Sequence, residues 1–242
     1  MDEIIERLKT DLYKYVHGTT EALVITNILN GILVLLYLHN TDPISIIEII
    51  TSIVSGLYLT DLGSGLFHIF SDICYSDTNQ NIIDLIKLAE IHHKDPKKTL
   101  DLKIIEHMKT ASFTPIPFLL VIYNLTPFSS KKQLLSHIIF MYSIQMSQIT
   151  HLLAHKMNHS TCEEKNTIPM KFLKTLQDNH IILHPEQHRK HHLSPNKDIN
   201  FCLLNGWANP LINSVIEIPC VKYVFRDVQT KRDKCVKNID KK

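Results

Sequence analysis

Three histidines lie close together in the segment HRKHHLSP, which covers residues 188–195. On a helix, His188, His191 and His192 stand at positions i, i+3 and i+4, so their imidazoles project from one face. That spacing is typical of metal ligands, although a solvated basic strip is the alternative interpretation. A metal site requires further ligands, so the other histidines of the chain decide between the two.

Two more segments have the spacing of metal ligands. HIFSD places His68 and Asp72 at i and i+4 of one helical face, and HKMNH does the same for His155 and His159. A histidine pair at this spacing is more often part of a helix surface than of a metal site. For that reason the pair of His151 with His155, like His184 alone, is a weaker prediction.

Adjacent histidines occur at positions 92 and 93. On a helix the two rings point in different directions, so they serve different metals, or one of them only orients a ligand. The four segments together supply about eight imidazoles and at least one carboxylate, more than the three or four ligands of one zinc site. Two metals with about four nitrogens each fit this number.

The kind of metal is not determined by ligand type, because imidazole suits zinc, copper, iron and nickel. A two-iron site is the arrangement that activates dioxygen for attack on an unreactive C–H bond. Soluble di-iron bundles use Glu and Glu-x-x-His ligands, and the chain has no such repeated motif. The histidine-rich version belongs to membrane enzymes.

The composition excludes several classes of protein. The net charge of the 242 residues is only +2 and cations are spread among acids, so no nucleic-acid-binding face is indicated. The five cysteines are scattered and form no CxxC pair, which argues against a disulfide framework or a thiolate zinc site. The N-terminal segment has no pattern of a secretory signal peptide. The 15 histidines are the one compositional anomaly.

Four stretches approach the roughly 20 apolar residues that a membrane-spanning helix needs. They are Ala22 to Leu38, Ile44 to Phe70, Ser112 to Phe128 and Leu134 to Leu153. The predicted fold is therefore all-α: an integral membrane bundle of about four transmembrane helices with a cytosolic, histidine-rich helical cap. A soluble helical bundle with buried helices is the alternative.

The distribution of Lys and Arg predicts the orientation in the membrane. Lysines are frequent between the second and third stretch and after the fourth, whereas the turn HNTDP after the first stretch has none. Both termini and the long connection are therefore expected in the cytosol. In that topology the ligand histidines all lie on the cytosolic side, where separate spans deliver them to one depth.

The order of these motifs resembles the Kua family of membrane lipid desaturases, whose members include animal plasmanylethanolamine desaturases and a plant plastid desaturase acting on phosphatidylglycerol. HxxxD at 68–72, HH at 92–93, HxxxH at 155–159 and HxxHH at 188–192 carry the resemblance. The stretches SGLFHIFSD, HHKDP, LQDNHIIL and HRKHHLSPNKDINFCLLNGWANP add to it. It covers roughly residues 60 to 210, and the LQDNH and FC forms are closer to the animal branch.

The resemblance implies two irons and a set of ligands: His68, Asp72, His92, His93, His155, His159, His188, His191 and His192. Asp95, Asp178 and His180 are expected to orient ligands without binding the metals. Departures from the family pattern are Ile69 after the first histidine, the apparent insertion at 160–167, and the position of His107. They leave the exact substrate open.

The implied function is O2-dependent desaturation of a lipid chain, with plasmanylethanolamine converted to the vinyl ether plasmenylethanolamine. An acyl-lipid desaturase or a hydroxylase of the same chemistry is the enzymatic alternative, and a metal-binding membrane scaffold or transporter is the non-enzymatic one. Partners are a membrane phospholipid and an external electron donor such as cytochrome b5, because the chain has no GxGxxG motif and LHPEQ lacks the glycines of a fused haem domain.

Three regions are expected along the chain. Residues 1–21 form a cytosolic N-terminal segment, residues 22–215 the lipid desaturase membrane domain with its histidine-rich cap, and residues 216–242 a basic cytosolic tail. The tail either attracts an acidic electron carrier or is merely solvated. The expected location is a multi-pass position in the endoplasmic reticulum membrane, with both termini in the cytosol.

Overall fold

Every regular element in the described part of the chain is a helix, as predicted. The computed structural model describes residues 20–76, 78, 80–110, 130–194 and 198–239. The helices are α2 (Thr20–His39), α3 (Ile46–Ile73), α4 (Gln80–Lys94), η1 (Pro96–Asp101), α5 (Ile104–Thr110), α7 (Lys131–His159), α8 (Cys162–Lys165), α9 (Ile168–Asp178), α10 (Pro185–Leu193), α11 (Asn209–Ile216) and α12 (Pro219–Ile239).

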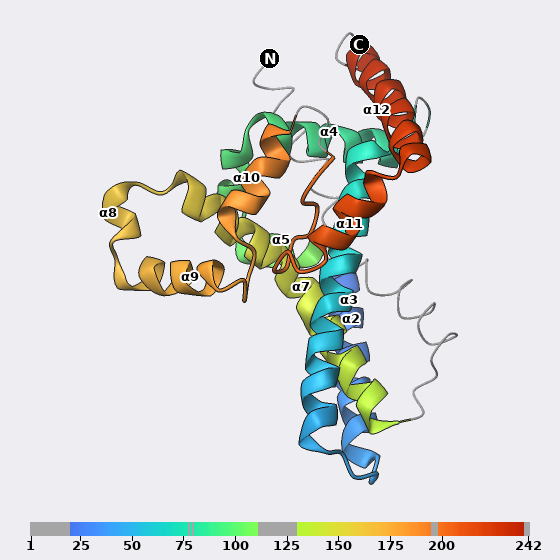
Figure 1. The fold of residues 1–242 in the computed structure, drawn as a ribbon, viewed down its shortest axis with the longest axis vertical. Helices are drawn as coiled ribbons and strands as arrows, with labels where there is room; N and C mark the ends of the chain where they lie inside the picture. The colour runs from blue at the N-terminus through green and yellow to red at the C-terminus, as the bar shows by residue number, and fades with distance from the viewer. Residues whose placement is uncertain (1–19, 77, 79, 111–129, 195–197, 240–242) are drawn as a thin grey trace.

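The helices divide into a stalk and a head. Helices α2, α3 and α7 pack together and form the long lower part of the molecule in Figure 1. Helices α4 and α11 pack against α3 and α10 packs against α7 in the head, the upper part of the molecule, from which α8 and α9 extend to one side. The stalk thus holds the head helices at one end of two long, adjacent helices.

Both long helices of the stalk begin with a capping box. In α3 the Ser45 hydroxyl accepts from Glu48 N at 3.3 Å and the Glu48 carboxylate accepts from Ser45 N at 2.9 Å. Ser130 and Gln133 form the same arrangement at the start of α7. Each box satisfies backbone donors that the first helical turn leaves without partners. The two helices therefore start at defined residues at the far end of the stalk.

Helix α3 has an inverted distribution of polar and apolar side chains. It buries small and polar residues and exposes its large apolar ones, with Ile47 69% and Ile50 54% exposed. Gly56 allows a close approach to α7, because a Cβ there would lie 2.7 Å from Ile139 Cβ. Helices that face lipid pack through small residues in this way and turn their apolar side chains outward. The pattern therefore indicates a lipid-facing stalk.

The four-span bundle is only partly visible in the structure. Among the described residues, α3 is the one helix long and apolar enough to cross a membrane. The apolar part of α2 is shorter (Leu23–His39), the predicted span 112–128 lies outside the described residues, and polar residues such as His137 and Gln145 interrupt the apolar run in α7. Helix α3 is therefore the candidate membrane span of the described chain.

Most of the residues expected to form a basic tail lie in α12. This helix packs against α3 and α11, where Phe225 is buried with Phe201, Ile212 and Ile216. Arg232 is also buried and binds Glu90 of α4 through Nη1 at 2.5 Å. The C-terminal region is thus a structural part of the head, while most of the expected N-terminal segment lies outside the described residues.

Candidate metal centre

The head brings histidines from four helices, α3, α4, α7 and α10, into two adjacent groups. Within each group, one ligand atom of every residue lies within 4.8 Å of the others. We call them group A and group B. Group A contains His68, Asp72, His93 and His191, and group B contains His92, His151, His155, His188 and His192.

Group A is arranged around a carboxylate. His93 Nε2 lies 3.1 Å from Asp72 Oδ1, and the Nε2 atoms of His68 and His191 lie 3.6 and 3.2 Å from Asp72 Oδ2. Helix α3 supplies His68 and Asp72 one turn apart, α4 supplies His93 and α10 supplies His191. All four side chains are nearly removed from solvent. Three imidazoles and one carboxylate therefore face a common point in the interior.

The tautomers in group A indicate that a cation belongs there. His68 Nδ1 lies 3.0 Å from Phe201 O and His191 Nδ1 lies 2.8 Å from Ile199 O. A carbonyl oxygen only accepts, so both Nδ1 atoms carry the proton and both Nε2 atoms present a lone pair to Asp72. Two lone pairs facing a buried carboxylate repel it unless a cation lies between them. A divalent metal meets that requirement.

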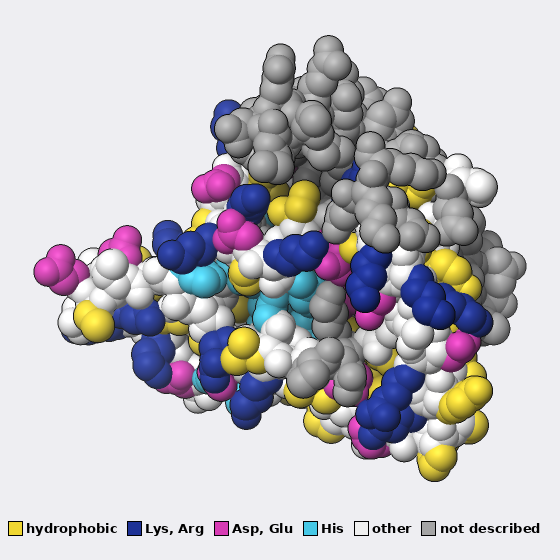
Figure 2. Space-filling view, turned by 90° about the horizontal axis from the view of Figure 1, so that it is seen from above, with side chains coloured by type: hydrophobic (Ala, Val, Ile, Leu, Met, Phe, Trp, Pro, Cys, Tyr) yellow, Lys and Arg dark blue, Asp and Glu magenta, His cyan; other side chains and the backbone are white. Residues whose placement is uncertain are grey.

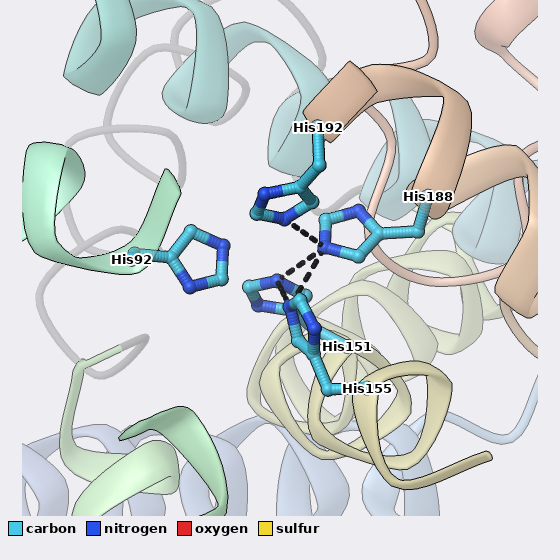
Figure 3. A group of neighbouring side chains, drawn as sticks. All are labelled: His92, His151, His155, His188 and His192. Atoms are coloured by element: carbon cyan, nitrogen blue, oxygen red, sulfur yellow. Dashed lines mark hydrogen bonds between the residues drawn. The ribbon is translucent and has the colours of Figure 1, made fainter. Parts of the chain in front are cut away.

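Group B consists of imidazoles alone, and Figure 3 shows them converging from three helices. His188 Nε2 lies 2.8 Å from His151 Nε2, 2.9 Å from His155 Nε2 and 2.9 Å from His192 Nε2. One imidazole nitrogen holds a single proton, so it cannot hydrogen-bond to three other nitrogens at once. The fifth ring, that of His92, enters from α4 on the opposite side.

The spacing of these nitrogens matches metal coordination. Metal–imidazole bonds are about 2.0–2.1 Å long, so two nitrogens at a right angle around one ion lie roughly 3 Å apart. Four Nε2–Nε2 separations among His151, His155, His188 and His192 are 2.8–3.0 Å. His92 Nε2 is buried without a hydrogen-bond partner and is available as a further metal ligand. The residues present in both groups therefore fit a metal ion.

Burial keeps the histidines of group B neutral. It lowers the pKa of His155 to about 3, with repulsion from His159 as the next cause. Burial, followed by repulsion from His151, likewise holds the pKa values of His92 and His188 well below their usual range. Neutral imidazole is the form that binds metals, so the lone pairs are available at neutral pH.

Groups A and B are adjacent and both contain residues of α4 and α10. His92 and His93 are neighbours on α4 but point into different groups, and on α10 His191 enters group A while His188 and His192 enter group B. The ring centroids of His93 in group A and His192 in group B are 4.7 Å apart. Two bound metals would therefore be immediate neighbours, as in a dinuclear centre.

The residues expected to orient the ligands lie elsewhere. Asp95 precedes η1, Asp178 binds Lys174, and the exposed His180 lies in a turn with a φ of 52°; none of the three belongs to either group. Backbone carbonyls hold His68 and His191 instead, and Thr99 Oγ1 lies 3.0 Å from His92 Nδ1. Sequence offers no signal for carbonyl partners, because every residue has one.

The HxxxH segment of α7 uses a different pair from the one expected. His159 is exposed at the end of the helix and outside both groups, whereas His151 is buried in group B with His155. Both pairs have i, i+4 spacing, so spacing alone does not choose between them. The two pairs differ in their position along the helix, because His159 is the last residue of α7 and His151 lies two turns inside it.

The comparison with known families agrees with this centre. A membrane-associated helical protein with two clustered histidine groups is the class defined by the fold and the site. The family model of the lipid desaturase domain matches residues 57–219, which include every member of groups A and B. The chain therefore belongs to the family of Kua-type, plasmanylethanolamine desaturase-like lipid desaturases. No solved structure matches the chain.

Proposed function

We propose that this protein is an O2-dependent di-iron desaturase that introduces a double bond into a lipid chain. Membership of the lipid desaturase family supports an oxidoreductase acting on lipids. The observation that carries the di-iron form is the pair of adjacent groups, with three imidazoles and a carboxylate in one and five imidazoles in the other. The bound irons supply the reduction of dioxygen and the removal of two hydrogens from neighbouring carbons.

The protein's own residues hold and orient the centre. Group A binds one metal through Nε2 atoms and a carboxylate, and the carbonyls of Phe201 and Ile199 keep the protons of His68 and His191 on Nδ1. Group B binds the other through imidazoles alone. The surrounding burial excludes water from the reactive centre and favours neutral ligands.

The overall reaction needs a source of electrons. Two hydrogens from the lipid, two electrons and two protons reduce one dioxygen to two waters and leave a carbon–carbon double bond. The electrons come from an external donor such as cytochrome b5. The face of the head seen in Figure 2 carries Lys and Arg side chains among Asp and Glu, with histidines near its middle, and offers a charged surface to such a carrier.

The proposed substrate is the alkyl ether chain of plasmanylethanolamine, which becomes a vinyl ether. We further propose a multi-pass position in the endoplasmic reticulum membrane with both termini in the cytosol. The exposed apolar side chains of α2 and α3 support a stalk in lipid, and the charged face of the head supports a position outside it. A lipid in the membrane would then reach the centre from the stalk side.

The experiment is lipid analysis of cells that lack ether-lipid desaturation and express this chain. Acid-labile vinyl ethers should appear, disappear in His192→Ala, and persist in the matched variant His159→Ala, whose histidine is exposed and outside both groups. New double bonds in acyl chains would instead show an acyl desaturase, and an added oxygen atom a hydroxylase. Unchanged lipids with well-expressed, iron-loaded protein would contradict desaturation.

A further inference from the structure

Asp61 is a fully buried carboxylate in the middle of α3. It lies seven residues before His68, two helical turns away on the same face. No residue of groups A and B contacts it through the hydrogen bonds of the described chain. Burying a carboxylate is costly unless hydrogen bonds satisfy it. Its partners therefore reveal what it does.

The partners are four backbone amides of one loop. Asp61 Oδ1 accepts from Leu204 N at 3.1 Å, Asn205 N at 3.0 Å and Gly206 N at 3.2 Å, and Oδ2 accepts from Ala208 N at 2.9 Å. Gly206 has a φ of 82°, which a residue without Cβ adopts readily. Consecutive amides that point at one anion form a backbone nest, and here the anion belongs to the protein itself.

Neighbouring polar groups join the same loop to α3. Ser64 Oγ, one turn after Asp61, accepts from Leu203 N at 3.1 Å. A carboxylate and a hydroxyl from α3 thus hold the loop through the amides of residues 203–206 and 208.

The beginning of this loop holds two ligands of group A. Phe201 O accepts from His68 Nδ1 and Ile199 O accepts from His191 Nδ1. Loss of the loop conformation would remove both carbonyls, so each imidazole could move its proton to Nε2 and lose its lone pair toward Asp72. The same loop also contacts α7, where the Thr150 hydroxyl donates to Leu203 O. The loop holds none of the imidazoles of group B.

We infer that Asp61 is a positioning residue that clamps the loop 199–208 and thereby sets the tautomers of His68 and His191. The inference that group A then binds its metal less well rests on the proposed di-iron function. The clamp itself is a property of the protein without metal. Its effect is directed to one half of the centre.

The test uses Asp61→Asn in the full-length protein, with Thr60→Val as the matched control. Asn keeps the size of the side chain, but its NH2 group cannot accept from Ala208 N. Thr60 is the adjacent buried residue and its hydroxyl donates to Gly56 O and Phe140 O, away from the loop. Both variants therefore remove polar contacts from the same stretch of α3.

The first measurement is made on metal-free protein labelled with ¹⁵N-histidine. The population of the Nδ1–H tautomer at His68 and His191 should be the same in the wild type and Thr60→Val, and lower in Asp61→Asn. Amides of residues 204–208 should exchange with solvent about tenfold faster in Asp61→Asn. Unchanged tautomers and unchanged exchange in Asp61→Asn would overturn the inference.

The second measurement counts iron bound per chain. Wild type and Thr60→Val should bind two, and Asp61→Asn should keep only the iron of group B. Loss of both irons in Asp61→Asn would overturn the selective role of the clamp. If the wild type binds no iron while the tautomers still respond, the proposed di-iron function fails and the positioning role stands.

Ser64→Ala keeps the test decisive if Asp61→Asn does not accumulate. This variant removes one hydrogen bond to the same loop at Leu203 N. Faster exchange at that amide and partial mixing of the His68 tautomers are expected. An exchange rate and a His68 tautomer population equal to those of the wild type in Ser64→Ala would contradict a clamp formed by α3.

Discussion

The clearest perturbation of group B is removal of His151, with His159 as its control. His151 Nε2 lies 2.8 Å from His188 Nε2 and 3.0 Å from His155 Nε2, whereas His159 is exposed outside both groups. The two histidines flank His155 at the same spacing, one on each side. Substituting each by alanine therefore asks which HxxxH pair binds metal.

The expected loss in His151→Ala follows from its central position. Removing even a residue that only orients a metal ligand weakens metal binding by about 10–100-fold. Loss of a metal ligand should weaken metal binding by at least the upper end of that range, roughly 100-fold, or about 2.8 kcal/mol. His159→Ala should stay within about threefold of the wild type, because an exposed side chain away from the centre contributes little.

The assay is titration of metal-free protein with Fe²⁺ under anaerobic conditions, with iron per chain measured after removal of excess metal. His151→Ala should retain about one iron, held by group A, and His159→Ala should retain two. The reasoning would be refuted if His159→Ala lost iron while His151→Ala kept both. Such a result would mean that the last turn of α7, and not the turn before His155, reaches the metals.

Three further predictions concern stability. The pKa of His155 is lowered by burial to about 3, against an ordinary value near 6.5. Below pH 6.5 the unfolded chain therefore binds more protons than the folded chain. As the pH falls from 6.5 toward 5, the free energy of unfolding of the metal-free protein should decrease by up to about 1.4 kcal/mol per pH unit for each such histidine. Melting temperatures that do not change with pH would contradict this prediction. Gly56→Ala should lower the free energy of unfolding by about 1–3 kcal/mol in a denaturation assay, because the new Cβ would overlap α7. Gly31→Ala, where a Cβ meets nothing within 4 Å, should not destabilise the protein. Equal effects of the two substitutions would refute the close packing of α3 and α7. Arg232→Met should remove the short ion pair to Glu90, whose carboxylate is 16% exposed and also lies 3.9 Å from Lys94 Nζ. Stability and iron content should both fall, the free energy of unfolding by up to about 3 kcal/mol, because Lys94 and partial exposure reduce the cost of breaking the pair. The exposed Arg226→Met is the control, and similar behaviour of both variants would exclude a structural role for the ion pair.

Periodicity predicted the helical class, and spacing together with the family resemblance predicted a ligand set of which all members but His159 lie in groups A and B. The i, i+3, i+4 cluster at 188–192 does lie on a helix that directs all three imidazoles to the two adjacent groups, and the adjacent histidines at 92 and 93 do point into different groups. These predictions depend only on local helical geometry, which spacing determines directly. The same reasoning is silent where two registers are equivalent, as in α7.

Long-range contacts explain the remaining differences. His68 and Phe201 are separated by 133 residues, and the hydrogen bond between them uses a main-chain carbonyl that no side-chain pattern marks. Carboxylates such as Asp95 were expected in that role because carboxylates are common partners of metal-bound histidines. The packing of α12 was also missed, because its charged sequence hides the buried Phe225 and Arg232.

The most direct test of the central claim is Mössbauer spectroscopy of purified full-length protein loaded with ⁵⁷Fe, together with the iron count. Two irons per chain, with two resolved signals from a histidine–carboxylate site and an all-histidine site, are the predicted result. A chain that binds no iron, or that binds one isolated ion, would contradict a dinuclear centre built from groups A and B.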